Sequence, residues 1–378
     1  MKFNVQKGDS MKKYLFLILL VCISTIFSGC SETVDTLSVS SQNNTVQSVN
    51  SSSNVVSTQP IVSTTSTPKK PKTFSITLSF AGDFIIANSE TTAYKNSFEE
   101  YAAQNTPDYF LQKVQSVFAK DDFTIVNLEN VLTDTDLEKR EKNHDPAYWF
   151  KAKTEHTKVL TKGSVECVSL ANNHTYDYGK QGYKDTTEAV KKAGLNYGNF
   201  NEIMYCEKNG FKIAVICYGL WRPDGVKTIQ NLIKRATQNS DYQIVFFHGG
   251  TEGIYTPEEW KVEACHTLVD SGADLIIGNH PHVLQPREIY KNTEIIYSLG
   301  NFLFGGNKKP GKNTIIYQMK LTVNAKTLEL KDEKSTIIPC YVYQGKLNNY
   351  QPQIIKDDLE KQRVLDFMNG KAKSPYLS

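Results

Sequence analysis

The sequence predicts an α/β domain with a β-sheet covered on both faces by helices. After Thr73, short β-branched or aromatic runs alternate with longer amphipathic stretches, which is typical of strands alternating with helices. Five of the runs also end in Asp, Glu, Asn or His, and functional sites of such sheets form at the carboxyl ends of the strands. The predicted strands are residues 74–83, 123–129, 165–173, 211–218, 242–250, 273–280 and 294–301.

Three stretches between these strands have helical character: residues 98–120, 181–193 and 257–271. Pro257 suits the first turn of a helix, and Gly194 and Gly272 suit the position just after one. From about residue 313 the chain has strand texture without intervening helices, and a final helix is expected to include residues 364–368.

The amino-terminal segment predicts export. Lys12 and Lys13 precede an apolar stretch, residues 14–27, which runs into Ser28-Gly29-Cys30. This is the layout of a secretory signal peptide, and the apolar stretch is shorter than the roughly 20 residues of a membrane-spanning helix. The residues FSGC resemble the lipobox of bacterial lipoproteins. We therefore expect residues 1–30 to be a lipoprotein signal peptide, with a lipid on Cys30 that anchors the exported protein at the outer face of the cell membrane.

Residues 31–72 are predicted to be a disordered linker. Nearly half of residues 31–68 are Ser or Thr and none is aromatic, so the segment cannot bury enough apolar surface to offset its ordering entropy. Such a linker would let a folded domain stand off the membrane. The net charge of +3 argues neither for nor against nucleic acid, and we expect no nucleic-acid partner.

The residues at the strand ends form a mixed oxygen and nitrogen ligand set. Such a set, without thiolates, suits Mn, Fe or Zn better than Ca or Mg. About six ligands can hold one or two ions, and paired ions bind an oxyanion and activate a water. The candidate metal ligands are Asp83, Glu129, Asn173, His248, His280 and His282.

Each of these motifs also has a plainer interpretation. A Gly-Asp pair at a strand end is common, Asn-Leu-Glu is compatible with a helix cap, and His248 alone is equally compatible with a core histidine. The pair His280 and His282 favours function, because Pro281 fixes φ and biases the preceding residues away from helix. Glycines beside the ligands let backbone and substrate approach closely, and these are Gly82, Gly249 and Gly278. Together the motifs predict a shared metal site, whereas His144, His156 and His266 lack this context.

Six stretches in this order resemble the CapA family of capsule and poly-γ-glutamate biosynthesis proteins: GD, NLE, SLANNHTYDYGKQG, HGGTEGIYTP, GADLIIGNHPHVLQ and YSLGNFLF. That family is similar to the calcineurin-like metallophosphoesterases. The resemblance covers residues 74–304 and implies a metallophosphatase-like layered α/β fold, with central β-sheets flanked by helices. We expect this domain to span residues 73–310, with residues 311–378 as a β-rich extension and final helix of the same domain.

The resemblance also implies roles for single residues. Asp83 and Glu129 match the two acidic ligands, Glu129 as the bridging one, and Asn127 is the next candidate for that role. In the Asn-His pair, Asn173 matches a metal ligand and His174 the residue that contacts the substrate oxyanion or leaving group. The later motifs of the family are matched by His248, Gly278, His280 and His282. The candidate substrate-binding residues are Asn127, Asn172 and Glu252.

Two positions depart from the phosphoesterase pattern. Ile85 stands where a ligating His is usual, and Thr175 stands where an acid usually follows Asn-His, although Asp177 lies close by. These departures leave open whether the protein is an enzyme. One hypothesis is a hydrolase of phosphoesters or amides, with water activated by a metal centre. The alternatives are a non-catalytic protein that binds an anionic polymer such as poly-γ-glutamate, and a surface sensor of a small ligand. The implied partners are that polymer or a phosphoester substrate, the membrane, and membrane proteins of capsule synthesis.

Overall fold

The computed structural model describes residues 72–89, 95–304 and 312–376. All of these belong to the second of two compact units, Pro68–Ser378. The predicted signal peptide, the lipid-carrying Cys30 and the linker lie outside the described residues, so they stay predictions. Within the described ranges, no helix combines the length and the apolar character needed to cross a membrane.

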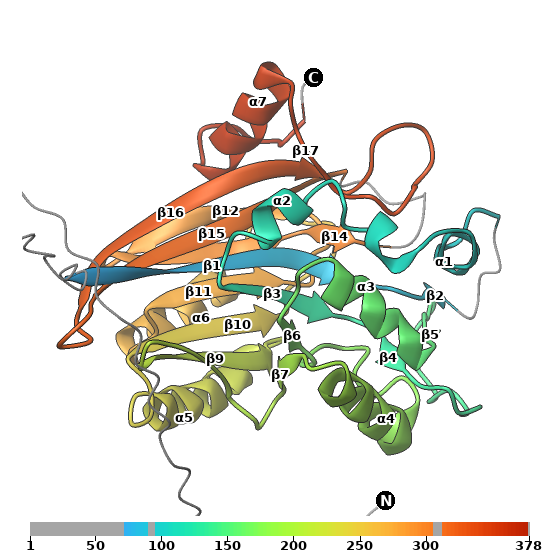
Figure 1. Cartoon of the computed structure of the whole chain (residues 1–378), viewed down its shortest axis with the longest axis horizontal. Helices are drawn as coiled ribbons and strands as arrows, with labels where there is room; N and C mark the ends of the chain where they lie inside the picture. Colours follow the sequence, from blue (N-terminus) through green and yellow to red (C-terminus); the bar gives the residue numbers. More distant parts are fainter. Residues whose placement is uncertain (1–71, 90–94, 305–311, 377–378) are drawn as a thin grey trace, which may run out of the picture. The chain divides into compact units, whose positions relative to one another are not determined.

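Two mixed β-sheets dominate the domain (Figure 1). The first sheet has parallel strands at its centre and antiparallel strands toward one edge. Its order is β17 (Gln353–Ile354), β16 (Leu330–Tyr341), β15 (Asn313–Asn324), β1 (Thr73–Phe84), β3 (Phe123–Leu128), β6 (Cys167–Ser169) and β7 (Asn196–Gly198), and β14 (Asn301–Leu303) pairs with the end of β1.

The second sheet has the order β12 (Leu284–Tyr290), β13 (Thr293–Leu299), β11 (Leu275–Asn279), β10 (Tyr242–His248), β9 (Phe211–Gly219) and β8 (Met204–Lys208). Its four central strands are parallel. A small third sheet joins β2 (Asn88–Ser89), β5 (Phe150–Ala152) and β4 (Val131–Leu132).

The main core lies between the two large sheets. In β1, Ile76, Leu78 and Phe80 alternate along the strand and join a buried apolar cluster with residues of the second sheet, such as Ile244 of β10. Because successive side chains of a strand point to opposite faces, Ala81 joins a different cluster on the outer face. The second sheet has a further buried cluster on its own outer face, so the central strands of both large sheets are buried on both faces.

Helices cover the two outer faces. Those on the first sheet are α1 (Phe98–Gln104), α2 (Gln115–Phe118), α3 (Thr157–Lys162) and α4 (Gly179–Lys192). Those on the second are α5 (Val226–Ala236) and α6 (Glu259–Asp270), whereas α7 (Asp358–Met368) packs beside β12 and β16. Short 3₁₀ turns complete the set: η1 (Pro107–Tyr109), η2 (Thr154–His156) and η3 (Pro223–Gly225).

The predicted α/β class is confirmed, and all seven predicted strands are present. The strands do not form the single sheet that the alternating pattern predicted, because β1, β3 and β6 belong to one sheet and the later four strands to the other. The helix predicted over residues 98–120 was wrong as one element. Asn105 is extended and Pro107, which lacks an N–H and disfavours helix at the residue before it, begins a separate 3₁₀ turn.

Two carboxyl groups lie near the amino ends of β3 and β6, opposite to the strand ends that carry the candidate ligands. Glu166 Oε2 accepts a 2.8 Å hydrogen bond from the Thr124 N–H, and Asp121 Oδ2 accepts one of 2.8 Å from the Thr124 hydroxyl. Burial raises the pKa of Glu166 to about 7 and that of Asp121 to about 6.

These raised pKa values predict a pH dependence of stability. A carboxyl with a higher pKa in the folded than in the unfolded protein binds more protons when folded, so the free energy of unfolding falls as pH rises through the folded pKa. We expect the free energy of unfolding in urea to decrease between about pH 4 and pH 7, and Glu166→Gln to flatten this decrease. The control Glu188→Gln, on the exposed side of α4, should keep the wild-type slope, and an unchanged slope in Glu166→Gln would contradict the assignment.

Candidate metal centre

The candidate ligands come from both large sheets and meet at one edge. The strands β1, β3 and β10 point toward the same side (Figure 1). Asp83 lies at the end of β1 and Glu129 just after β3, while His248 ends β10 and His280 and His282 follow β11. Because parallel strands bring their carboxyl ends to one edge, residues far apart in sequence become neighbours.

Glycines at this edge make room for neighbouring backbone. A Cβ atom on Gly249 would lie 1.7 Å from the carbonyl oxygen of Leu220, and one on Gly82 would lie 1.8 Å from that of Gly300. Gly278 approaches the carbonyl of Tyr297 in the same way, at 2.2 Å. Any side chain at these positions would push the strand ends apart, so the glycines set how closely the ligands converge.

The carboxylate of Glu129 is the centre of the cluster. It is fully buried, and its Oε1 atom has no hydrogen-bond partner among the described residues. Three imidazole Nε2 atoms surround this oxygen, those of His248 at 3.4 Å, His282 at 3.8 Å and His174 at 3.9 Å. These distances exceed the usual 2.7–3.2 Å or so of N–H···O hydrogen bonds. The oxygen and the nitrogens thus face a common space without bonding one another.

Asp83 forms the second acidic part of the site. Its Oδ2 atom lies 3.1 Å from His282 Nδ1, and its Oδ1 atom lies 3.5 Å from His248 Nδ1. Asn127 donates a 2.8 Å hydrogen bond to Asp83 Oδ1, and the same amide nitrogen lies 3.1 Å from His248 Nδ1. Asn127 thereby orients the acidic residue and a histidine at once.

The charges of this cluster shift its pKa values strongly. Burial raises the pKa of Asp83, but the hydrogen bonds and positive charges of His248 and His282 outweigh burial and lower it overall. Burial also lowers the pKa of His248, yet the negative charges of Glu129 and Asp83 raise it to about 9. Burial and the neighbouring His248 and His282 hold the pKa of His280 well below its usual value. The site therefore favours an anionic Asp83 beside a neutral His280.

The remaining predicted ligands border the same space. Asn173 Oδ1 lies 2.8 Å from His248 Nε2, and His280 Nδ1 lies 3.0 Å from that nitrogen. His280 and His282 have positive φ angles of 95° and 58°, which are strained for residues other than glycine. The expectation that Pro281 keeps the preceding backbone out of the helical region holds, but His280 adopts positive φ rather than the extended conformation usual before proline.

Two groups of side chains have the spacing needed to hold a metal ion. One consists of Glu129, His280 and His282, and the other of Asp83, Glu129 and His248, with the ligand atoms of each group within 4.8 Å of one another. The groups share Glu129, whose unpartnered oxygen is where a bridging ligand atom would lie. The donor set and this orphaned atom fit one or two divalent cations.

Some side chains differ from the resembled pattern. Ile85 is buried in the apolar cluster on the outer face of the first sheet, so it supplies no ligand atom. A residue that the sequence interpretation missed, Asn301 of β14, places Oδ1 2.9 Å from His282 Nδ1. The sequence did contain an indication of this role, because Asn301 is the polar residue that ends the predicted strand 294–301.

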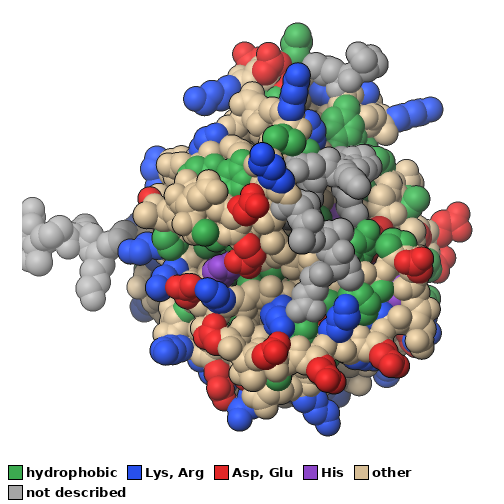
Figure 2. Space-filling view, turned by 90° about the vertical axis from the view of Figure 1, so that its right-hand side faces the viewer, with side chains coloured by type: hydrophobic (Ala, Val, Ile, Leu, Met, Phe, Trp, Pro, Cys, Tyr) green, Lys and Arg blue, Asp and Glu red, His purple; other side chains and the backbone are tan. Residues whose placement is uncertain are grey.

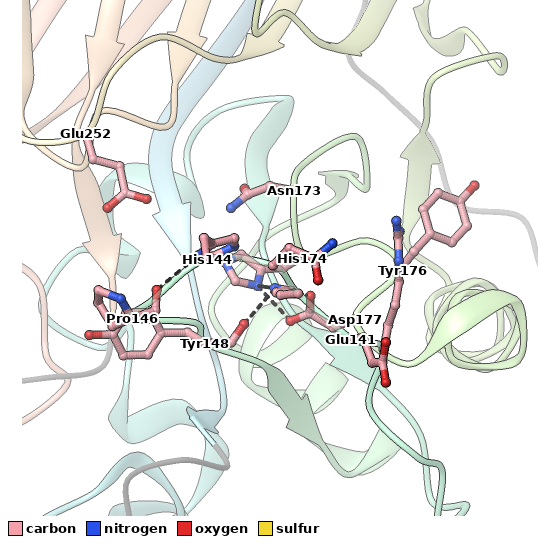
Figure 3. A pocket seen from close by; sticks show the side chains of 12 residues that line it. Glu141, His144, Pro146, Tyr148, Asn173, His174, Tyr176, Asp177 and Glu252 are labelled. Atoms are coloured by element: carbon pink, nitrogen blue, oxygen red, sulfur yellow. Dashed lines mark hydrogen bonds and ion pairs between the residues drawn. The ribbon is translucent and has the colours of Figure 1, made fainter.

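The predicted substrate-binding residues occupy different places. Asn127 and Asn172 are buried, and Asn172 donates hydrogen bonds to Asn127 Oδ1 and to the carbonyl of Leu128. Glu252 instead lines a pocket of about 640 Å³ that adjoins Asn173 and His174 (Figure 3).

A carboxylate supports His174, although the position after the Asn-His pair is not acidic. His174 Nδ1 lies 2.7 Å from Asp177 Oδ2, one turn further along the chain. Thr175 itself has a structural role, because its hydroxyl bonds the carbonyl of Leu170 at 2.6 Å and accepts the Asn172 N–H at 3.0 Å. An acidic side chain therefore does contact His174, but Asp177 supplies it instead of the residue at position 175.

The fold and the site define a two-sheet α/β protein with a buried Asp/Glu/His cluster that can bind metal. A family model described as bacterial capsule synthesis protein PGA_cap matches residues 77–306. The chain belongs to this family of capsule synthesis proteins. The predicted family relationship is thus confirmed.

Individual relatives agree with the family match. PGA biosynthesis protein CapA of Bacillus subtilis (strain 168) is 30% identical over 280 residues, covering 68% of this chain and 71% of that protein. Capsule biosynthesis protein CapA of Bacillus anthracis is 29% identical over 282 residues, covering 68% and 66%. The aligned region thus spans about two thirds of each relative.

Similar solved structures include a phosphatase from Mycoplasma pneumoniae, with a TM-score of 0.43 and 18% identity, covering 70% of this chain and 94% of that one. A hypothetical protein from Thermus thermophilus has a TM-score of 0.43 and 13% identity, covering 70% and 99%.

The shared ligand Glu129 predicts how stability responds to metal. A cation that binds only the folded protein raises the melting temperature, by about 5 °C or more at a hundredfold excess over Kd. We expect Mn²⁺ or Zn²⁺ to produce this rise in metal-free protein and a chelator to reverse it. Glu129→Gln should lose most of the rise, whereas His266→Ala, at a surface ion pair with Glu288, should keep it. An equal rise in Glu129→Gln would show that the ion binds elsewhere.

Proposed function

We propose that the protein is a metal-dependent hydrolase of the cell envelope, which cleaves a phosphoester or an amide during synthesis or export of a poly-γ-glutamate capsule. The observation that carries the proposal is the pair of ligand groups that share Glu129 beside His174. A purely structural cluster would be expected to satisfy the buried Glu129 oxygen with a hydrogen bond. The names of the two Bacillus relatives support the link to capsule synthesis.

Mn, Fe or Zn ions suit these donors, with Asp83, Glu129 and the three histidines as ligands and Asn173 as an amide ligand. When bound, such an ion supplies Lewis acidity and lowers the pKa of water. Neighbouring side chains orient these ligands. Asn127 donates a hydrogen bond to Asp83, and Asn301 contacts Nδ1 of His282, the ring atom that also lies near Asp83.

His174 has the geometry of a proton donor to the leaving group. Its Nδ1–H donates to Asp177, so Nε2 is directed toward Glu129 and the centre of the cluster. In the proposed reaction a water molecule forms the new bond to the phosphorus or carbonyl carbon and loses a proton, and the bond to the leaving oxygen or nitrogen breaks. The leaving atom takes the Nε2 proton of doubly protonated His174, whose Nδ1–H stays bonded to Asp177. The adjoining pocket has room for the leaving portion of the substrate.

A second candidate function is binding of an anionic polymer without cleavage. It is favoured by Ile85, which removes one ligand from the usual phosphoesterase set. Figure 2 shows the side of the molecule to which β1, β3 and β10 point, and among its described residues acidic and basic side chains are interspersed. A polymer would therefore be recognised at the ion-binding cluster rather than by a broad basic surface.

Hydrolysis assays separate the two functions. We expect the protein loaded with Mn²⁺ or Zn²⁺ to hydrolyse a nitrophenyl phosphodiester, a nitrophenyl phosphomonoester or the γ-amide bonds of poly-γ-glutamate, and a chelator to abolish this. His174→Ala should lower kcat by about 10²- to 10⁴-fold while its metal content stays unchanged. His266→Ala is the control and should retain full activity.

Metal binding without turnover of any of these substrates would contradict the hydrolase. Binding of intact polymer that His280→Ala abolishes would then establish the second function. Export and anchoring through Cys30 belong to the proposal as well. They predict that labelled fatty acid enters the protein in cells and that Cys30→Ser abolishes this labelling.

A further inference from the structure

A lysine from outside the ligand motifs reaches the histidine that faces the leaving group. Residues 133–149, which connect β4 to β5, pass along the side of His174. Backbone and ring contacts hold this segment in place. The Arg140 N–H donates a 2.8 Å hydrogen bond to the Asp177 carbonyl, and the Trp149 ring N–H donates one of 2.6 Å to the Arg140 carbonyl.

Within this segment, Lys142 points inward and its side chain is only 14% exposed. Its Nζ atom lies 2.6 Å from Asp177 Oδ1, donates a 2.6 Å hydrogen bond to the Tyr148 carbonyl, and lies 3.4 Å from His174 Nδ1. Figure 3 shows His174 and Asp177 joined by a dashed contact, with Tyr148 beside them in the lining of the pocket. The ammonium group of Lys142 thus contacts these three protein groups and is largely shielded from solvent.

Asp177 is the link between the lysine and the histidine. Its side chain is 1% exposed, and Oδ2 lies 2.7 Å from His174 Nδ1 and accepts a 3.0 Å hydrogen bond from the Phe150 N–H. Lys142 forms an ion pair with the other oxygen, which has no hydrogen-bond partner among the described residues, so this cation is what holds that side of the carboxylate. Removing one partner of a buried ion pair leaves an uncompensated charge, which would reorient or hydrate Asp177.

The orientation of His174 depends on that carboxylate. The Phe150 ring packs edge-on against the imidazole, with ring centroids 4.7 Å apart, and limits its other movements. The hydrogen bond to Asp177 keeps a proton on Nδ1 and directs Nε2 toward Glu129, so the doubly protonated ring presents its second proton on that side.

We propose that Lys142 is a positioning residue, which fixes Asp177 and thereby holds His174 in the orientation needed to protonate the leaving group. This inference rests on the proposed hydrolase function. It goes beyond the resemblance, which assigns no role to the segment between β4 and β5. The leaving portion of the substrate then lies in the pocket that Lys142, His174 and Glu252 line.

The same segment offers a matched control. Lys139 lies 4.6 Å from the centre of the Trp149 ring, and Lys142 lies 5.5 Å from it. Among the described residues, Lys139 has no contact with Asp177. Lys139→Met therefore removes a charge from the segment without touching the network, whereas Lys142→Met removes the network's cation. Lys142→Arg keeps the charge and serves as the conservative variant.

The first measurement uses metal-free full-length protein and needs no substrate. Spectra of the ¹⁵N-labelled histidine rings report which nitrogen of His174 carries the proton and whether that proton is hydrogen bonded. We expect a hydrogen-bonded Nδ1 proton in the wild type, in Lys139→Met and in Lys142→Arg, and its loss in Lys142→Met. Unchanged His174 signals in folded Lys142→Met would overturn the proposal.

The second measurement compares leaving groups in the metal-loaded protein. A proton donor matters more for phenol, a poor leaving group, than for 4-nitrophenol. We expect Lys142→Met to lower kcat at least about tenfold for a phosphodiester that releases phenol and by less than about threefold for one that releases 4-nitrophenol, with KM nearly unchanged. Lys142→Arg should recover most of the loss. An equal loss for both substrates would indicate general structural damage and overturn the proposal.

The two measurements also separate this inference from the function on which it rests. If the wild type binds metal but hydrolyses neither substrate, the hydrolase function fails, and the catalytic part of the proposal fails with it. The histidine spectra then still decide whether Lys142 positions His174.

Discussion

The structure depends on one buried carboxylate, that of Glu129. Its Oε1 atom has no hydrogen-bond partner in the part of the chain that the structure describes, and three imidazole nitrogens face it at 3.4–3.9 Å. An unsatisfied buried acceptor costs about 1–3 kcal/mol, and more when it is charged. A cation between these atoms would remove that cost. The strand ends, the glycines that bring them together and the strained histidine backbone all serve to gather ligands around this oxygen.

The strain at the histidine pair follows from the same constraint. His280 and His282 both adopt positive φ, and residues in such conformations cost of the order of 1–3 kcal/mol each. Both sheets and the helices on their outer faces surround this edge with fully buried apolar side chains, and that packing offsets the strain. The fold can therefore hold two imidazoles one residue apart on the same centre. Asn301 and Asp83 both contact Nδ1 of His282 and so orient its ring.

Much of this arrangement could be predicted from the sequence, and the limits have physical causes. Strand runs that end in polar residues predicted Asp83, Glu129 and His248 at one edge, because strand periodicity and end position are local properties. The alternating pattern alone could not predict the division into two sheets, since the apolar runs are equally compatible with one sheet; only the family resemblance implied more than one. Lys142 carried no signal, because it lies in a segment without periodicity and acts through contacts with residues distant in the sequence. Asp177 was noticed only as a neighbour of the expected acid position.

The central proposal is that Glu129 would ligate a metal ion at the junction of the two sheets. Anomalous X-ray diffraction from crystals grown with Mn²⁺ or Zn²⁺ tests this most directly. The account predicts one or two peaks between Glu129 and the histidines, at about 2.0–2.2 Å from a Glu129 oxygen. A metal-loaded crystal with no peak at Glu129, or with the ion bound only elsewhere, would contradict it.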